Sequence, residues 1–139
     1  MPRPKKTDSR QPSELELQVL NVLWEKTKGT VREVMDALPD GKQRAYTTVL
    51  SVMQLMEKKK MLSRSAQGGR HVYRPKLKQA KVGKTLLERI VHYAFGQSAG
   101  KAIVQLMGNY RLETDEIQEI RALLDQHEEE NLKRKGTLC

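Results

Sequence analysis

The chain has 139 residues, of which 37% are hydrophobic and 4% aromatic. This length suits one domain or two small ones, and the scarcity of aromatic residues disfavours an aromatic-rich β-sandwich. No apolar stretch is long enough to span a membrane, and no apolar segment follows the charged N-terminus as in a secretory signal. The single cysteine, Cys139, excludes an internal disulfide and a multi-cysteine zinc site, and indicates a reducing, cytoplasmic setting.

The positive charge is concentrated in the first half of the chain. Lys and Arg number 26 against 17 Asp and Glu, a net charge of +9. Residues 1–78 carry 17 basic and 8 acidic side chains, whereas residues 79–139 carry 9 of each. A solubilising surface could explain the charge alone, but the asymmetry favours a first half that meets a polyanion and a second half with another role.

The first elements are expected to be helices with capping boxes. Residues 1–11 are predicted to be a disordered basic arm. Ser13 and Glu16 then form the capping-box pattern that opens a helix, which Lys28-Gly29 is expected to end. Apolar residues at helical spacing predict one face of this helix: Leu17, Leu20 and Trp24. Thr30 and Glu33 repeat the pattern for a short second helix.

A third helix and a hairpin follow in the sequence. The third helix is expected from about Ala45 to Lys59, after the polar turn that contains Lys42. Two extended runs, Met61–Ser65 and Arg70–Arg74, come next, and Pro75 closes the second. Gly68-Gly69 between them predicts a tight turn, because glycine takes positive φ without a Cβ clash.

The second half contains only predicted helices. They are expected at about Gln79–Ala94, at Ser98–Met107 and after an N-cap at Thr114, with a flexible tail at residues 128–139. Three such helices are too thin to bury a core alone, which favours burial against a second copy. The predicted dimerisation residues are Leu86, Leu87, Ile90, Val91, Ile103, Leu106, Ile117, Ile120 and Leu124.

Three helices followed by a hairpin give the order of a winged helix-turn-helix. The expected fold is therefore mainly α with a small β-hairpin wing: a winged-helix domain at residues 12–77 and a three-helix dimerisation domain at residues 78–127. In such a domain the recognition helix enters the major groove and the wing follows the phosphate backbone. The predicted DNA-binding residues are Lys42, Arg44, Tyr46, Thr47, Thr48, Ser51, Arg64, Arg70 and Arg74.

Several motifs resemble the penicillinase and methicillin-resistance repressors of the BlaI/MecI type. They are Glu16-x-x-Val19-Leu20-x-x-Leu23-Trp24, Ala45-Tyr46-Thr47-Thr48-Val49, Glu57-Lys58-Lys59, Leu62-x-Arg64 and Gly69-Arg70-x-Val72-Tyr73-x-Pro75. The similarity covers about residues 12–125 and is strongest in the first half. It implies a homodimeric repressor of transcription that binds double-stranded operator DNA with dyad symmetry.

The chain departs from that family in three places. Lys59-Lys60 stands where members often have Lys-Gly, so Lys60 is strained if the position needs positive φ. The stretch Ile103–Met107 lacks the Asn-Phe bond at which such repressors are cut, and one cysteine cannot supply the paired motifs of copper-responsive relatives. A sensor-linked protease acting elsewhere in residues 96–111, a ligand, a redox change at Cys139 and no dedicated inducer are alternatives for the release of DNA.

An enzyme is not expected. His71, His92 and His127 lie in three separate elements, and the chain shows no phosphate-binding loop or nucleophile motif. No metal or cofactor is therefore predicted. Two rivals to the repressor hypothesis are a winged-helix module that binds an acidic partner of the transcription machinery, and a non-specific architectural DNA binder.

Overall fold

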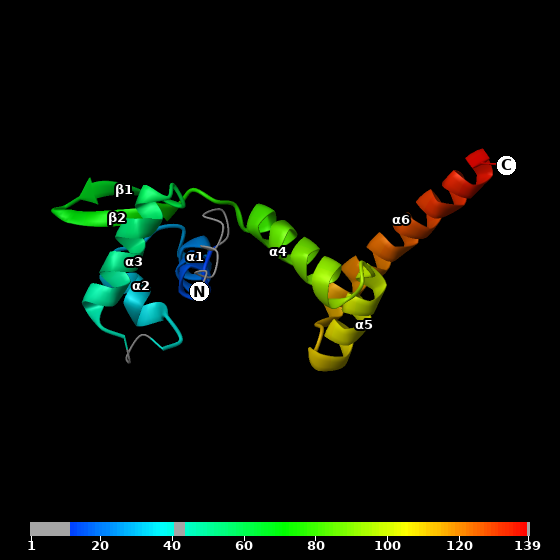
Figure 1. The fold of residues 1–139 in the computed structure, drawn as a ribbon, viewed down its shortest axis with the longest axis horizontal. Coiled ribbons are helices and arrows are strands. Elements are labelled where there is room, and N and C mark those ends of the chain that lie inside the picture. The colour runs from blue at the N-terminus through cyan, green and yellow to red at the C-terminus, as the bar shows by residue number, and fades with distance from the viewer. Residues whose placement is uncertain (1–11, 41–43, 139) are drawn as a thin grey trace, which may run out of the picture. The chain divides into compact units, whose positions relative to one another are not determined.

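The computed structural model describes residues 12–40 and 44–138 (Figure 1). The predicted arm at residues 1–11, Lys42 and Cys139 lie outside the described residues. The chain divides into two compact units after Glu88. Its order of three helices, a hairpin and three further helices confirms the predicted fold class. Within the described part, no helix combines the length and apolar character needed to cross a membrane.

The first unit contains the predicted winged helix. Its elements are α1 (Glu14–Lys26), α2 (Val31–Ala37), α3 (Tyr46–Lys58), β1 (Leu62–Gln67) and β2 (Arg70–Pro75). Both predicted capping boxes are present. The Ser13 and Thr30 hydroxyls accept from the backbone N–H groups of Glu16 and Glu33, and those carboxylates accept in return. The boxes satisfy N–H groups that would otherwise have no partner at the start of α1 and α2.

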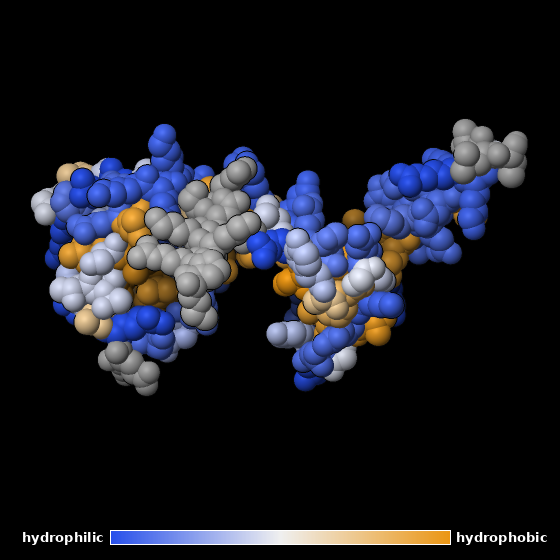
Figure 2. Space-filling model, in the orientation of Figure 1, coloured by the Kyte–Doolittle hydropathy of each residue, from blue (hydrophilic) through white to orange (hydrophobic). Residues whose placement is uncertain are grey.

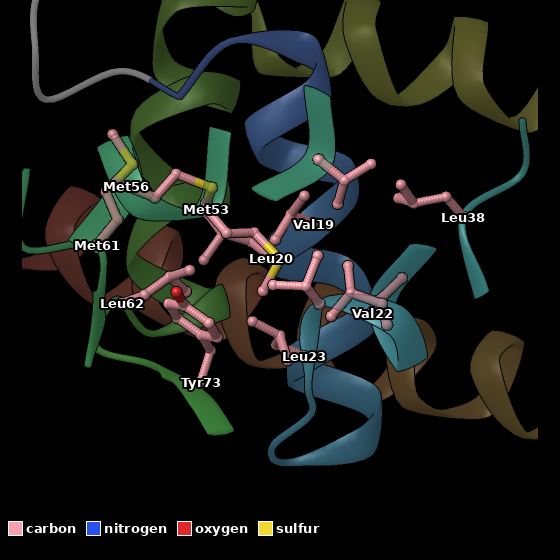
Figure 3. Close-up of a cluster of buried hydrophobic side chains, with 13 residues drawn as sticks. Val19, Leu20, Val22, Leu23, Leu38, Met53, Met56, Met61, Leu62 and Tyr73 are labelled. Carbon is pink, nitrogen blue, oxygen red and sulfur yellow. The ribbon is translucent and has the colours of Figure 1, made fainter. Parts of the chain in front are cut away.

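One hydrophobic core joins the three helices to the hairpin (Figure 3). Val19, Leu20 and Leu23 on α1 are fully buried, as are Met53 and Met56 on α3. Of the three residues predicted to share one face of α1, Leu20 is fully buried, whereas Leu17 and Trp24 are half-buried and Leu17 lies outside this cluster. The buried stripe lies a little further round the helix and includes Glu16, which is 4% exposed.

The chain between α1 and α2 makes an isolated antiparallel β-bridge with β2. Helix α1 ends at Lys26, earlier than predicted, and Thr27 takes the positive φ of 78°. Gly29 therefore does not end the helix but pairs with β2. Its N–H donates to the Tyr73 carbonyl at 3.0 Å, and the Tyr73 N–H donates back at 2.8 Å. This bridge attaches the wing to the helices, which the helix-ending role assigned to Gly29 did not anticipate.

The predicted hairpin is present, with strands that run to the turn. Leu62 pairs with Pro75 and Gln67 pairs with Arg70. The two turn glycines have φ of 57° and 79°, the left-handed values expected of a two-residue turn. The strands extend beyond Ser65 because a two-residue turn lets pairing continue up to Gln67.

Helix α3 ends at a lysine in the left-handed region. Lys60 has φ of 65°, and the Met61 N–H reaches back to the Met56 carbonyl at 2.9 Å. This is the geometry in which glycine is usually found after a helix. Lys60 therefore has the positive φ on which the predicted strain depends.

The second half is helical, but two boundaries differ from the sequence prediction. Its helices are α4 (Gln79–Ala94), α5 (Ala99–Asn109) and α6 (Thr114–Leu138). Gly108 lies inside α5 rather than in a loop. The tail expected to be flexible from residue 128 is helical as far as Leu138. Opposite charges four residues apart, Glu129 with Lys133 and Glu130 with Arg134, favour this extension.

Candidate nucleic-acid interface

The outer face of α3 carries a stripe of polar side chains. Thr47, Ser51, Gln54 and Lys58 recur at three- and four-residue steps, so they lie along one side of the helix, and all are exposed. Thr48 is exposed beside them, while Val49 and Met53 hold the opposite side in the core. The α3 stripe thus presents hydroxyl, amide and ammonium groups on a rigid helix. Groups of these kinds hydrogen-bond to base edges and phosphates.

Three arginines of the hairpin differ in how free their side chains are. Arg70, next to the turn, is exposed. Arg74 is held along the sheet, where its Nη1 donates to the Ser65 hydroxyl at 3.0 Å. The Arg64 Nε lies 3.2 Å from a Glu57 carboxylate oxygen, which ties the wing to the end of α3. Arg70 is therefore the arginine of this group best placed to meet a phosphate.

Arg44, predicted to contact DNA, is engaged by an acidic neighbour. Its Nη2 lies 2.7 Å from Asp40 Oδ2, and both side chains are about one-third exposed, at 30% and 35%. The hydrogen bond from Arg44 is the main reason that the pKa of Asp40 lies below its usual value, and the same bond raises the pKa of Arg44. The pair joins Asp40, which follows α2, to Arg44, which precedes α3, so Arg44 has a structural role.

A groove of about 530 Å³ lies between α2, α3 and the wing. Its described lining includes three arginines and a histidine but no carboxylate. The lining residues are Thr30, Val31, Arg32, Tyr46, Leu50, Gln54, Arg64, Gly69, Arg70, His71 and Tyr73. We call this the basic groove. It brings Tyr46, Arg64 and Arg70 together with residues that were not predicted to bind DNA.

Arg32 is the main residue that the sequence analysis missed. Its guanidinium carbon lies 5.3 Å from the centre of the Tyr46 ring, within the range of a cation–π contact. This contact connects α2 to the first turn of α3. Gln54 was also missed, although its seven-residue separation from Thr47 places it on the same helix face. For Arg32 no local pattern was available, because the contact joins two helices.

A partly buried ion pair fixes the far end of α3. The Lys59 Nζ lies 3.1 Å from Glu16 Oε2, and the Glu16 side chain is 5% exposed. The same carboxylate caps α1 through its other oxygen, at 2.8 Å from the Ser13 N–H. A second contact connects α1 to the segment after the wing, since the Trp24 indole N–H donates to the Leu77 carbonyl at 2.8 Å. These contacts orient α3 and the segment after the wing.

The predicted dimerisation residues remain largely uncovered in the single chain. Leu86, Val91, Ile117 and Ile120 are half-buried, and Leu87, Ile90, Ile103, Leu106 and Leu124 are exposed. Among the described residues from 89 to 136, Ala102 is the one that is buried. Figure 2 shows hydrophobic surface in the region of α5 and the start of α6. The second unit thus has almost no core of its own.

No alternative chemical site emerges from the described part of the chain. It contains no group of three or more His, Cys, Asp or Glu side chains arranged to hold a metal ion. His92 contacts the amide of Gln97 at 3.3 Å and packs edge-on against Tyr93. His71 lines the basic groove.

The fold and this surface define a winged helix-turn-helix protein with a helical C-terminal region. The sequence profile described as "Penicillinase repressor" matches residues 12–126. The chain therefore belongs to the penicillinase repressor family, as its motifs predicted. It is also 38% identical over 63 residues to "Transcriptional regulator BlaI" from two strains of Mycobacterium tuberculosis, CDC 1551 / Oshkosh and ATCC 25618 / H37Rv. That match spans 45% of this chain and 46% of the relative, slightly under half of each.

Proposed function

We propose that this protein is a transcriptional repressor that binds a dyad operator in double-stranded DNA as a homodimer. The observation that carries the proposal is the polar α3 stripe beside the basic groove. The family and the printed name of the mycobacterial relative support the same class of function, and both names are those of regulators rather than enzymes. The proposed role locates the protein in the cytoplasm, with the DNA.

In the proposed complex α3 enters the major groove. Thr47, Thr48, Ser51 and Gln54 reach base edges, where an amide such as Gln54 can bond an adenine through two hydrogen bonds. Arg70 and Arg32 contact phosphates on either side of the basic groove, and Arg74 supports the wing. Tyr46 orients Arg32 through the ring contact. The second half of the chain has no net charge, so it does not neutralise the net positive charge of the first half.

The homodimer rests on the uncovered apolar residues of α4, α5 and α6. Apolar area buried on association stabilises a dimer by roughly 25 cal/mol per Å², and a helical unit without a core has much to gain. A two-fold dimer brings two α3 helices to one side of DNA, so the operator should be a dyad.

Selection of genomic DNA fragments at physiological salt tests the function directly. The protein should retain particular duplexes that share an inverted repeat, with a preference over random DNA of roughly 10³ or more. Equal retention of all fragments would indicate an architectural binder. Retention of none, with capture of an acidic protein instead, would support the interaction-module rival.

Relief of repression by proteolysis is a further part of the proposal. The connections at residues 95–98 and 110–113 join helices, and a protease needs an exposed segment that can open locally. Cutting at residues 95–98 would separate the DNA-binding half from the apolar residues of α5 and α6, and cutting at residues 110–113 would remove those of α6. Either cut would weaken binding to a dyad. Immunoblotting before and after derepression should show a fragment of the N-terminal half. Full-length protein that persists while target genes are expressed would exclude cleavage.

A further inference from the structure

The end of α6 has a charge order that complements itself when the chain direction is reversed. Glu128–Glu130 precede Asn131 and Leu132, and Lys133–Lys135 follow. Beside a second copy running the opposite way, each glutamate of this segment lies level with a basic residue: Glu128 with Lys135, Glu129 with Arg134 and Glu130 with Lys133. In a parallel alignment glutamate would face glutamate and lysine would face lysine. Only the antiparallel arrangement is therefore attractive along the whole segment.

Pairing within the helix explains part of this pattern but not its ends. Glu129 and Lys133 have the four-residue spacing of an intrahelical pair. Glu128 has Leu132 four residues on, and Lys135 has Asn131 four residues back. Glu128 and Lys135 are seven residues apart, roughly 10 Å along the helix, which is too far for them to pair with each other. An antiparallel copy places each beside its opposite charge.

These two charges share a helix face with apolar residues that have no cover. Leu124, Glu128 and Leu132 follow one another at four-residue steps, and Lys135 lies on the same side. Leu124 is 56% exposed and Leu132 is 66% exposed. All described side chains from 121 to 136 are exposed, and Figure 2 shows the outer part of α6 as mainly hydrophilic.

We propose that residues 128–135 of α6 pair antiparallel with the same segment of a second copy of this chain. The two-fold axis passes between Asn131 and Leu132, where the two Leu132 side chains meet. Glu128 lies beside Lys135 of the partner subunit at both ends. The segment lies beyond residues 12–126, the part that matches the family profile. The pairing does not depend on DNA binding.

Cysteine crosslinking tests the arrangement in full-length protein that carries Cys139→Ser. Leu132→Cys should form a disulfide between copies under mild oxidation, because the two positions meet near the axis. Glu128→Cys alone should not, since the two copies of this position lie about 10 Å apart along the axes. The double variant Glu128→Cys, Lys135→Cys should crosslink. Glu130→Cys, on the opposite side of the helix, is the matched control.

Two crosslinking results would overturn the proposal. Efficient crosslinking by Glu128→Cys alone would show a parallel pair. A yield for Leu132→Cys no higher than that for Glu130→Cys would show that the copies do not meet at this segment.

Charge reversal provides a second test with the Leu132→Cys yield as its readout. Glu128→Lys should reduce the yield roughly tenfold, because two attractive pairs become repulsive in the symmetric complex. Adding Lys135→Glu should restore it, since the swapped charges attract again. Helix content from circular dichroism should be the same in all variants, because these side chains are exposed. An unchanged yield in Glu128→Lys, or no recovery in the double variant, would contradict the pairing.

Discussion

Thr47 at the start of α3 and Arg70 beside the wing turn are both exposed, yet they are expected to contribute to DNA binding in different ways. A hydroxyl at a base edge reads sequence, whereas a guanidinium at a phosphate adds affinity for any duplex. The same distinction separates Gln54 from Arg32.

Single alanine substitutions should reveal this difference. Thr47→Ala should reduce discrimination at one base pair by about 1–3 kcal/mol. Arg70→Ala should weaken binding to operator and random DNA alike, and lower the slope of log affinity against log salt by roughly one unit. Fluorescence anisotropy at several salt concentrations measures both. Arg121→Ala, an exposed arginine on α6, is the control, and identical profiles for the first two variants would refute the assignment.

The pair between Asp40 and Arg44 gives a prediction about pH. Because the folded-state pKa of Asp40 is lowered by Arg44, the pair stabilises the fold above the ordinary pKa of 3.8. That contribution is lost as the pH falls through the lower folded value. Asp40→Asn should therefore be less stable than the wild type at pH 7, and the difference should vanish in acid. Urea unfolding at pH 7 and below pH 3 measures this.

The same variant should bind DNA more tightly, because it removes a negative charge and releases Arg44. The salt slope should rise by roughly one unit. An affinity lower than that of the wild type at neutral pH would show instead that Arg44 must be held by Asp40 to support α3.

At the scale of secondary-structure elements, the residue that joins α3 to the hairpin, Lys60, has an unfavourable backbone conformation. Lys60→Gly should stabilise the protein by about 0.5–1 kcal/mol, because a side chain at positive φ is strained and glycine is not. Gly68→Ala is the matched reverse change at φ of 57°, where nothing lies within 4 Å of the added Cβ. It should destabilise the fold by about 1 kcal/mol through the backbone alone.

Urea unfolding followed by tryptophan fluorescence measures both changes. Trp24 is the one tryptophan of the chain and packs against the winged-helix core, so its emission reports that unit. A loss of stability in Lys60→Gly would mean that the lysine side chain makes a contribution that outweighs its strain.

At the scale of the whole molecule, the second unit should depend on its partner copy. Ile90→Asp should give monomers, since a charge on an exposed apolar face opposes its burial in a dimer. Ile90 is a better position than Ile120, which is half-buried and could unfold the chain when replaced. Light scattering gives the mass, with Arg121→Asp as the control. A monomeric wild type at micromolar concentration would reject the dimer.

Much of this organisation was determined by the sequence alone. Capping boxes, the Gly-Gly turn and apolar spacing are local patterns, so the helices, the hairpin and the fold class were predicted correctly. The charge asymmetry also predicted that the first half meets a polyanion. Errors arose at boundaries, as for Gly29 and the end of α6, where tertiary pairing or side-chain spacing outweighs the local signal.

The tertiary structure decided the contacts that join distant segments. Arg32 meets Tyr46, Arg44 is occupied by Asp40, and Glu16 both caps α1 and holds Lys59 of α3. The bridge from Gly29 to Tyr73 belongs to the same group. No periodicity encodes such contacts, because they depend on the packing of helices and strands against one core. They determine which basic side chains of the winged-helix unit are free to meet a phosphate.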